Sequence, residues 1–260
     1  MQKHSKKIRA ILVIFVLFCS NIYAQEMTKI VAHRGAWKEF DLPQNSIASL
    51  NKAIEINAHG TEFDVHRTKD DVLIVFHDSS IDRKNIEDLT YDELKKYPLK
   101  NGEYIPVLHD FLTKGFKQNK TQLVLEIKSS PTSVANTKKT VDLVYEELKK
   151  HQFKPDLLQI IMFSWEGAVY AKTKFPNIVI QYLEGDKTIE EVKQSGLDGI
   201  DYHYSVLLKN KKWLALAKQN KIITNSWTIN EWSIAKELID YSLEIITTDY
   251  PLLFLEKVNN

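Results

Sequence analysis

Short β-like runs alternate with amphipathic helical stretches along most of the chain, and this alternation restricts the possible folds more than any other feature. It is the pattern expected of a parallel sheet whose strands are joined by helical crossovers. Eight such runs predict a single (β/α)8 TIM barrel, whereas a doubly wound open sheet with extra edge strands is the alternative. The runs are KIVAH (29–33), TEFDVH (61–66), QLVLEIK (122–128), LQIIMFS (158–164), NIVIQYL (177–183), LDGID (197–201), KIITNSW (221–227) and LEIITTD (243–249).

One segment interrupts the alternation. Residues 67–121, between the second and third runs, are too long for one crossover. They contain a further strand-like run at 72–76, a polar helix near 90–96 and a helix near 107–116. We expect a local elaboration beside the mouth of the barrel. Because no tract rich in Pro, Gly and Ser divides the rest, one domain is predicted over residues 25–260.

The first 24 residues differ from the rest in composition. Residues 1–9 carry four basic side chains and no acid, residues 10–18 are all apolar, and the small Ala24 follows, as in a secretory signal. The apolar part is much shorter than the ~20 residues that a spanning helix needs. We therefore predict an exported protein, periplasmic or secreted, that is cleaved after Ala24. A lipid anchor on Cys19 is less favoured because the bulky Phe18 precedes it.

Removal of this segment changes the charge and the cysteine content of the chain. The formal net charge goes from +1 to about −3, and the single cysteine is lost. No basic field remains to attract nucleic acid, and no exposed basic amphipathic helix is evident that would hold the mature chain on a membrane. Disulfide and thiol chemistry are likewise excluded. We expect a small-molecule partner, and the sequence gives no information on the oligomeric state.

Acidic side chains occupy inward positions on two of the predicted strands. Glu62 and Asp64 share one face of their strand because they lie two residues apart, and Glu126 has the same orientation between two apolar neighbours. Carboxylates that face a barrel axis are costly unless they are paired or bound to a cation. Ligation by oxygen alone favours Mg²⁺ or Ca²⁺ over Zn²⁺. These three acids are therefore candidate metal ligands, and an ion-pair network with Arg34 and Lys128 is the alternative.

Histidines and further cations lie at the same strand ends, where a barrel of this type builds its active site. His33 and His77 each end a strand-like run, and histidine is suited to exchanging protons near neutral pH. Arg34 and Lys128 add two positive charges. Arg, Lys and a divalent ion together suit a phosphoryl group, whose transfer depends mainly on charge stabilisation. The residues thus predict phosphoryl-transfer chemistry.

Blocks that contain these residues follow one another along almost the whole mature chain. They are AHRG (32–35), LPQNSIASL (42–50), GTEFDVHRTKDD (60–71), VFHDSSIDR (75–83), IPVL (105–108), LEIK (125–128), WTIN (227–230) and TTDYP (247–251). In this order they resemble the signature blocks of the glycerophosphodiester phosphodiesterases. Chance alone would not place so many matching polar residues in a fixed order on successive strand ends.

The resemblance implies a (β/α)8 barrel that hydrolyses glycerophosphodiesters to sn-glycerol 3-phosphate and an alcohol with a bound divalent cation. Related enzymes are thought to use a hydroxyl of the substrate's own glycerol as the first nucleophile, which gives a cyclic phosphate that water opens. The sequence does not separate this route from direct attack by water. The roles implied by matching motif are metal ligation by Glu62, Asp64 and Glu126, acid–base catalysis by His33 and His77, and phosphate binding by Arg34 and Lys128.

Some positions depart from the family pattern. Gln44 stands where the family usually has Glu, and we expect either Asn45 or Ser46 to cap the helix that runs to Ile56. Asp71 replaces a turn glycine, which Asp tolerates because it accepts the left-handed conformation more readily than most residues. His109 follows IPVL where an acid is common, and a difference in substrate specificity would follow if that acid contacts substrate in relatives.

Four further residues are weaker candidates. Trp227 ends the seventh run, where its ring can pack on the glycerol of a substrate or serve as a core aromatic. Asn230 and Asp249 are weaker still, because an Asn after a strand can simply start a helix and Asp249 precedes Pro251 at a chain turn. His66 shares a strand face with Asp64 and can support the site indirectly.

Three functions are compatible with these residues. The leading hypothesis is an exported, metal-dependent phosphodiesterase acting on water-soluble diesters such as deacylated phospholipid head groups. A lysophospholipase D or phospholipase-type barrel acting on intact lipid is the nearest alternative. The third is a non-catalytic barrel that binds a phosphodiester or a cell-wall polymer, and the presence of all seven central residues argues against it.

Overall fold

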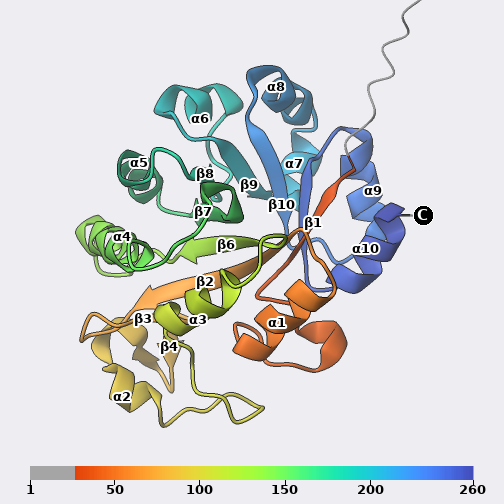
Figure 1. Ribbon diagram of the computed structural model, residues 1–260. Coiled ribbons are helices and arrows are strands. Elements are labelled where there is room, and N and C mark those ends of the chain that lie inside the picture. The colour runs from red at the N-terminus through yellow and green to blue at the C-terminus, as the bar shows by residue number, and fades with distance from the viewer. Residues whose placement is uncertain (1–26, 260) are drawn as a thin grey trace, which may run out of the picture.

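A computed structural model describes residues 27–259 and shows a closed parallel barrel surrounded by helices (Figure 1). Each barrel strand pairs in parallel with two others, and the pairing of β1 with both β2 and β11 closes the sheet. The predicted (β/α)8 barrel is therefore confirmed, and the open sheet is wrong. Its strands, which fall on the eight predicted runs, are β1 (Lys29–Ala32), β2 (Gly60–Arg67), β6 (Gln122–Ile127), β7 (Leu158–Met162), β8 (Val179–Tyr182), β9 (Gly199–His203), β10 (Ile223–Trp227) and β11 (Ile245–Thr248).

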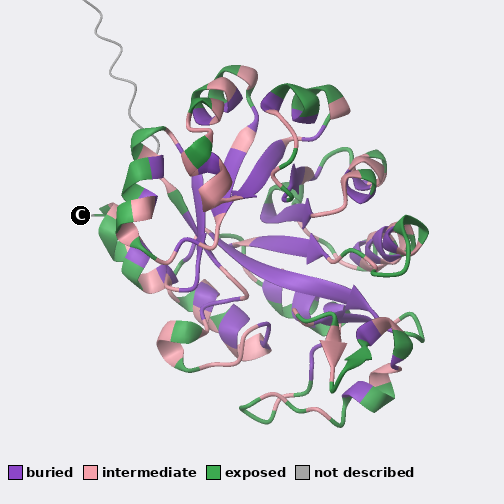
Figure 2. Ribbon diagram, turned by 180° about the vertical axis from the view of Figure 1, so that it is seen from behind, coloured by how far each residue is buried: buried purple, intermediate pink, exposed green. Residues whose placement is uncertain are grey.

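The helices cover the outer face of the barrel, and Figure 2 shows buried strands inside a ring of helices with exposed outer surfaces. Outward-facing strand residues pack against them: the ring of Phe63 lies 4.5 Å from the ring of Phe111, centroid to centroid. The helices are α1 (Ile47–Glu55), α3 (Leu108–Gly115), α4 (Val134–Leu148), α5 (Trp165–Lys174), α6 (Ile189–Ser195), α7 (Tyr204–Lys209), α8 (Lys212–Asn220), α9 (Trp232–Asp240) and α10 (Pro251–Asn259), with the 3₁₀ turns η1 (Lys38–Phe40) and η3 (Pro155–Leu157).

The expected elaboration consists of an insertion, residues 68–107, followed by α3, which is the crossover to β6. Within the insertion, β3 (Leu73–Val75) pairs antiparallel with the end of β2, Val75 lying opposite Val65. The insertion has a small apolar core of its own, formed by Ile74, Ile86, Leu89, Leu94 and Ile105. It also contains β4 (Ser80–Ile81), β5 (Lys84–Asn85), η2 (Ile86–Asp88) and α2 (Tyr91–Leu94).

Two expectations from the sequence concern other parts of the chain. Asp71 has a φ of +61°, so it does take the left-handed conformation expected at this turn. The expected signal segment, residues 1–24, lies outside the described residues. Within residues 27–259, no helix combines the length and the apolarity that crossing a bilayer requires.

Candidate active site

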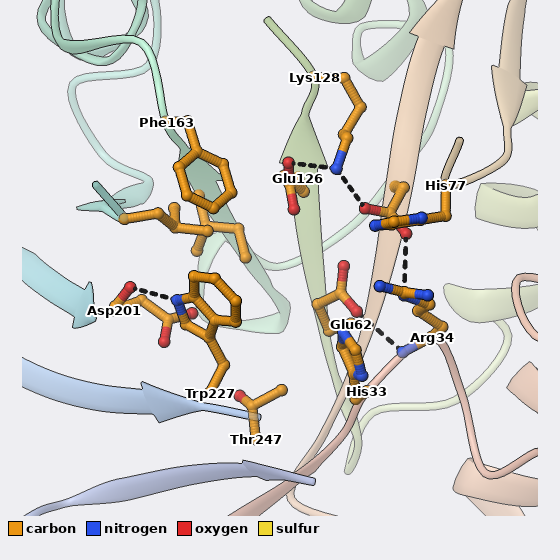
Figure 3. Close-up of a pocket in the computed structure, with 13 residues that line it drawn as sticks. His33, Arg34, Glu62, His77, Glu126, Lys128, Phe163, Asp201, Trp227 and Thr247 are labelled. Carbon is orange, nitrogen blue, oxygen red and sulfur yellow. Dashed lines mark hydrogen bonds and ion pairs between the residues drawn. The ribbon is translucent and has the colours of Figure 1, made fainter. Parts of the chain in front are cut away.

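A pocket lies at the carboxyl ends of the barrel strands (Figure 3). All eight site residues named from the sequence line it, so strand ends distant in sequence meet as expected. Five further lining residues were not anticipated. The lining residues are His33, Arg34, Glu62, Asp64, His77, Glu126, Lys128 and Trp227, together with Ile161, Phe163, Leu183, Asp201 and Thr247.

Three buried carboxylates form the centre of the site. Asp64 on β2 lies opposite Glu126 on β6, and Glu62 precedes Asp64 on the same inward face. One oxygen of each lies within 4.8 Å of the others, and the side chains are almost inaccessible to solvent. Glu62 Oε1 is buried with no hydrogen-bond partner among the described residues. An unpaired oxygen within an all-carboxylate group fits a hard divalent cation, so these residues can hold one.

The three carboxyl groups differ in proton affinity. Burial, reinforced by the charges of its two neighbours, raises the pKa of Glu62 well above its usual value. Burial and the charge of Asp64 raise the pKa of Glu126 to about 7. Burial alone would also raise the pKa of Asp64, but Lys128, His77, Asn45 and Arg34 lower it to about 2. Without a cation, the two glutamates therefore keep their protons to a higher pH than usual, whereas Asp64 stays ionised to a lower pH than usual.

Asp64 is fixed by Asn45, one of the two residues expected to cap α1. Asn45 does not cap α1: it has a φ of +56°, its Nδ2 donates to Asp64 Oδ2 at 2.8 Å, and its Oδ1 accepts from the Asp64 backbone N–H at 3.2 Å. Ser46 is the N-cap, since its hydroxyl accepts from the Ser49 N–H at 2.9 Å. The long-range contact with Asp64 takes precedence over capping at Asn45.

A left-handed turn places Arg34 beside the carboxylates. Arg34 has a φ of +57° and Gly35 a φ of +85°, and the Arg34 backbone N–H donates to Glu62 Oε2 at 2.8 Å. A Cβ on Gly35 would lie 2.4 Å from Ser49 Oγ, so only glycine fits without movement of α1. Arg34 Nη1 donates to Gln44 Oε1 at 2.8 Å. Gln44 thus supplies a side-chain oxygen to Arg34 at the position where the family usually has Glu.

Lys128 completes the charged wall of the pocket. Its Nζ lies 3.1 Å from Asp64 Oδ1 and 2.8 Å from Glu126 Oε1. Burial alone would lower the pKa of Lys128, but these two carboxylates raise it, so the side chain stays charged. The ion pairs of the alternative interpretation are therefore present. They leave Glu62 Oε1 unpaired and hold both cations at the pocket, where they can also contact an anion.

His33 is oriented by Asp249. His33 Nδ1 donates to Asp249 Oδ1 at 2.7 Å, and Asp249 Oδ2 accepts from Asn230 Nδ2 at 2.9 Å and from Lys38 Nζ at 3.3 Å. Burial alone would raise the pKa of Asp249, but its contacts with His33, Asn230 and Lys38 lower it to about 2. The weaker candidates Asn230 and Asp249 thus belong to the site as positioning residues. Nε2 remains the ring nitrogen of His33 that can exchange a proton with a ligand.

His77 has the same arrangement on another element. It follows β3 in the insertion, and its Nδ1 donates to Asp78 Oδ1 at 2.7 Å. Burial lowers the pKa of His77 despite the opposing effects of Asp64 and Asp78. His66 Nε2 donates to the backbone oxygen of His77 at 3.1 Å, which is the indirect support considered for His66. Two histidines with carboxylate-bound Nδ1 atoms therefore flank the acidic centre (Figure 3).

Comparisons with known proteins agree with this geometry. A sequence profile described as the glycerophosphoryl diester phosphodiesterase family matches residues 33–253. The chain belongs to this family. A glycerophosphodiester phosphodiesterase of Bacillus subtilis is 28% identical, covering 90% of this chain and 87% of the relative. Members of the family are phosphoric diester hydrolases, so the resemblance and the enzyme class expected from the sequence are both confirmed at the level of the family.

Solved structures support the family assignment. A crystal structure of a glycerophosphodiester phosphodiesterase from Parabacteroides distasonis is 36% identical with a TM-score of 0.86, covering 90% of this chain and 97% of that one. A phosphodiesterase of Oleispira antarctica, solved in complex with its product sn-glycerol-3-phosphate, is 25% identical with a TM-score of 0.76, covering 90% and 98%. The fold similarity thus extends over nearly the whole family domain.

The wall of the pocket formed by β7 to β11 is largely apolar. Trp227 Nε1 donates to the backbone oxygen of Asp201 at 2.9 Å, and the Trp227 ring meets Phe163 edge-on at 5.6 Å between centroids. The indole is therefore fixed in place as part of the wall. Asp201 was missed although LDGID was recognised as a strand. The signal available in the sequence was strand alternation: Asp201 follows the apolar Ile200 and therefore faces the other side of the strand, toward the barrel axis.

His109 lies outside the pocket. Its Nδ1 bonds Glu147 Oε1 at 2.8 Å, and the same oxygen is 3.2 Å from His151 Nε2. His109 is more than half exposed and is not among the lining residues. The departure from the family pattern at this position therefore involves a contact between α3 and the end of α4, and no contact with a ligand in the pocket.

Proposed function

We propose that this chain is a metal-dependent glycerophosphodiester phosphodiesterase that releases sn-glycerol 3-phosphate and an alcohol. One observation carries the proposal: buried carboxylates, two histidines oriented by carboxylates, and two cations line a single pocket. Family membership supports it, as does the relative of Oleispira antarctica solved with sn-glycerol-3-phosphate. An ion-pair network with a purely structural role would not require two such histidines at a pocket.

The charged residues would bind the phosphodiester. Arg34 and Lys128 would contact the non-bridging phosphate oxygens, because both cations line the pocket next to the carboxylates. Glu62, Asp64 and Glu126 would hold Mg²⁺ or Ca²⁺, as expected for oxygen donors. When bound, this ion would supply positive charge that stabilises the additional negative charge of the phosphoryl transition state.

The histidines would move the protons. One accepts the proton of the attacking hydroxyl, and the other donates a proton to the oxygen of the departing alcohol while the phosphorus–oxygen bond breaks. Asp249 and Asp78 hold the Nδ1–H groups of His33 and His77, so each Nε2 is available for this exchange. Both routes remain compatible with the site: attack by a glycerol hydroxyl with a cyclic phosphate intermediate, and direct attack by water.

The test is direct measurement of the product. Purified protein is incubated with glycerophosphocholine, and sn-glycerol 3-phosphate is quantified with and without a chelator. We expect turnover that the chelator abolishes and Mg²⁺ or Ca²⁺ restores. Turnover that resists the chelator would contradict the metal requirement, and no turnover on a panel of head groups would contradict the activity. The surface variant His109→Asn serves as the control and should retain the parent rate.

Two further properties belong to the proposal. Water-soluble, deacylated diesters are favoured as substrates, and a lysophospholipase D or phospholipase-type activity would instead show a rate that depends on micelles or vesicles. Export to the periplasm or medium is proposed from the N-terminal sequence, with cleavage after Ala24. N-terminal sequencing of the protein recovered from those fractions should begin at Gln25. Retention of Met1 in the mature protein would contradict export by this signal.

A further inference from the structure

Asp201 is a pocket-lining carboxyl group that the proposed mechanism does not use. It lies on β9 and is only 1% exposed, yet it lines the pocket. Its Oδ1 is buried with no hydrogen-bond partner among residues 27–259. A buried polar atom without a partner carries a desolvation cost, which a ligand that completes its hydrogen bonding can relieve.

The surroundings of Asp201 indicate what kind of ligand group would complete this bonding. Ile161, Phe163, Leu183 and Trp227 supply an apolar wall, and among the lining residues on this side Asp201 carries the one ionisable side chain. Burial, with a smaller effect of Glu126, raises the pKa of Asp201 well above its usual value. In either protonation state, a carboxyl oxygen can accept a hydrogen bond from an alcohol hydroxyl, which is a neutral donor suited to an apolar wall.

We propose that Asp201 is a specificity-determining residue whose carboxyl group binds the free terminal hydroxyl of the substrate's glycerol unit. The inference rests on the proposed function and narrows its substrate class. The glycerol unit is the part shared by all glycerophosphodiesters, so it suits a fixed, enclosed wall. The alcohol varies between substrates and must extend toward the open side of the pocket.

This arrangement separates deacylated diesters from lipids. In a 1-acyl lysophospholipid the terminal hydroxyl is esterified, so it has no proton to donate. The acyl chain would also have to lie against the apolar wall beside Asp201. Such a substrate would supply no hydrogen-bond donor to Asp201 Oδ1. Asp201 therefore acts against the lysophospholipase D alternative and in favour of glycerophosphodiesters with a free terminal hydroxyl.

The experiment compares two diesters that differ in one hydroxyl. Glycerophosphocholine has the terminal hydroxyl, and 2-hydroxypropyl phosphocholine lacks it but keeps the hydroxyl next to the phosphorylated carbon. For the parent protein we expect kcat/KM to favour glycerophosphocholine by at least about 100-fold, because sites built to bind a hydroxyl reject analogues without it strongly. Lysophosphatidylcholine should be hydrolysed at least about 100-fold more slowly for the same reason.

Two substitutions test the role of Asp201 itself. Asp201→Ala should lower the preference for the terminal hydroxyl at least tenfold, mainly through a loss of rate on glycerophosphocholine. Asp201→Asn keeps a neutral donor and acceptor of the same shape, so it should retain most of the preference. Asp198→Asn is the matched control: this acid lies three residues earlier, bonds Lys172 and the Ile180 N–H, and does not line the pocket.

Several outcomes would overturn the assignment. A parent protein that hydrolyses both diesters at rates within threefold has no such subsite, whichever variants fold. An Asp201→Ala variant that slows both diesters equally would show a structural role only, and efficient hydrolysis of lysophosphatidylcholine would contradict the selection. If neither diester is hydrolysed, the proposed function fails. Calorimetry then still decides whether Asp201 binds the hydroxyl. The affinities of the parent and Asp201→Ala proteins are compared for sn-glycerol 3-phosphate and for 2-hydroxypropyl phosphate.

Discussion

Glu126 should destabilise the metal-free protein at neutral and alkaline pH. Its pKa rises from 4.5 to about 7 on folding because burial and the charge of Asp64 oppose ionisation. Between these two values the folded state holds a proton that the unfolded state has released. Since the folded state binds more protons in this window, stability must fall as the pH rises through it.

The size of the effect follows from the pKa change. Each pKa unit corresponds to about 1.4 kcal/mol, so ionising Glu126 costs the folded protein roughly 3 kcal/mol above pH 7. Glu126→Gln replaces the group with a neutral side chain of nearly the same shape. In the presence of a chelator we therefore expect the variant to be about 3 kcal/mol more stable than the parent at pH 8 and equal to it at pH 4.

The assay is equilibrium denaturation in urea at both pH values. Asp64→Asn is the matched control within the same cluster, because the pKa of Asp64 moves the other way, from 3.8 to about 2. Its ionised form stabilises the fold above pH 4, and the stabilisation is lost as the pH falls through 2. The Asn variant should therefore be roughly 2 kcal/mol less stable than the parent at pH 8.

Addition of Mg²⁺ or Ca²⁺ should make the parent protein more stable than Glu126→Gln, which reverses the order expected in chelator. An ion that binds only the folded state stabilises the parent, whereas Glu126→Gln has lost a ligand and should respond weakly. The reasoning would be refuted if Glu126→Gln were less stable than the parent at pH 8 in chelator. That result would mean that the ion pair between Glu126 and Lys128 outweighs the effects of burial and of the Asp64 charge.

Three further predictions concern the histidines, the turn and the outer core. His33→Ala and His77→Ala should each lower kcat by ~10²–10⁴ while His109→Ala leaves it unchanged, and a loss below tenfold in steady-state assays would contradict the acid–base assignment. Gly35→Ala should lower the free energy of unfolding by more than ~2 kcal/mol in denaturation experiments, because the new methyl group would clash with Ser49 of α1 and because alanine is strained at a positive φ. Phe63→Ala should cost ~3–5 kcal/mol by the same measurement with kcat retained in the folded fraction, because Phe63 packs outside the barrel.

The barrel and the centre of the site were predictable from local pattern. Alternation of side chains along a strand fixes which residues face inward, so Glu62, Asp64 and Glu126 could be assigned to one face before any contact was known. Closure of the barrel then brings together strand ends that are far apart in sequence. His33, Arg34 and Lys128 lie at such ends, which explains why they were found together at the pocket.

Contacts between distant segments could not be predicted in this way. The sequence predicts capping at Asn45 because a helix cap depends only on neighbouring residues in the chain. The hydrogen bond from Asn45 to Asp64 depends instead on how β1 and β2 pair. The bond between His33 and Asp249 joins opposite ends of the chain and requires β1 beside β11. Asp201 carried no motif, and its unpaired oxygen becomes visible only once the neighbouring strands enclose it.

The two histidines reach the pocket by different routes, and this has a consequence for how the protein loses activity. His33 follows a barrel strand, whereas His77 follows β3 in the insertion, whose outer part packs around a second, smaller apolar core. Regions with small cores open at lower free energy than the structure as a whole. Mild heating should therefore displace His77 from the pocket before the barrel unfolds. The protein would then still bind phosphate and the cation but would no longer hydrolyse its substrate.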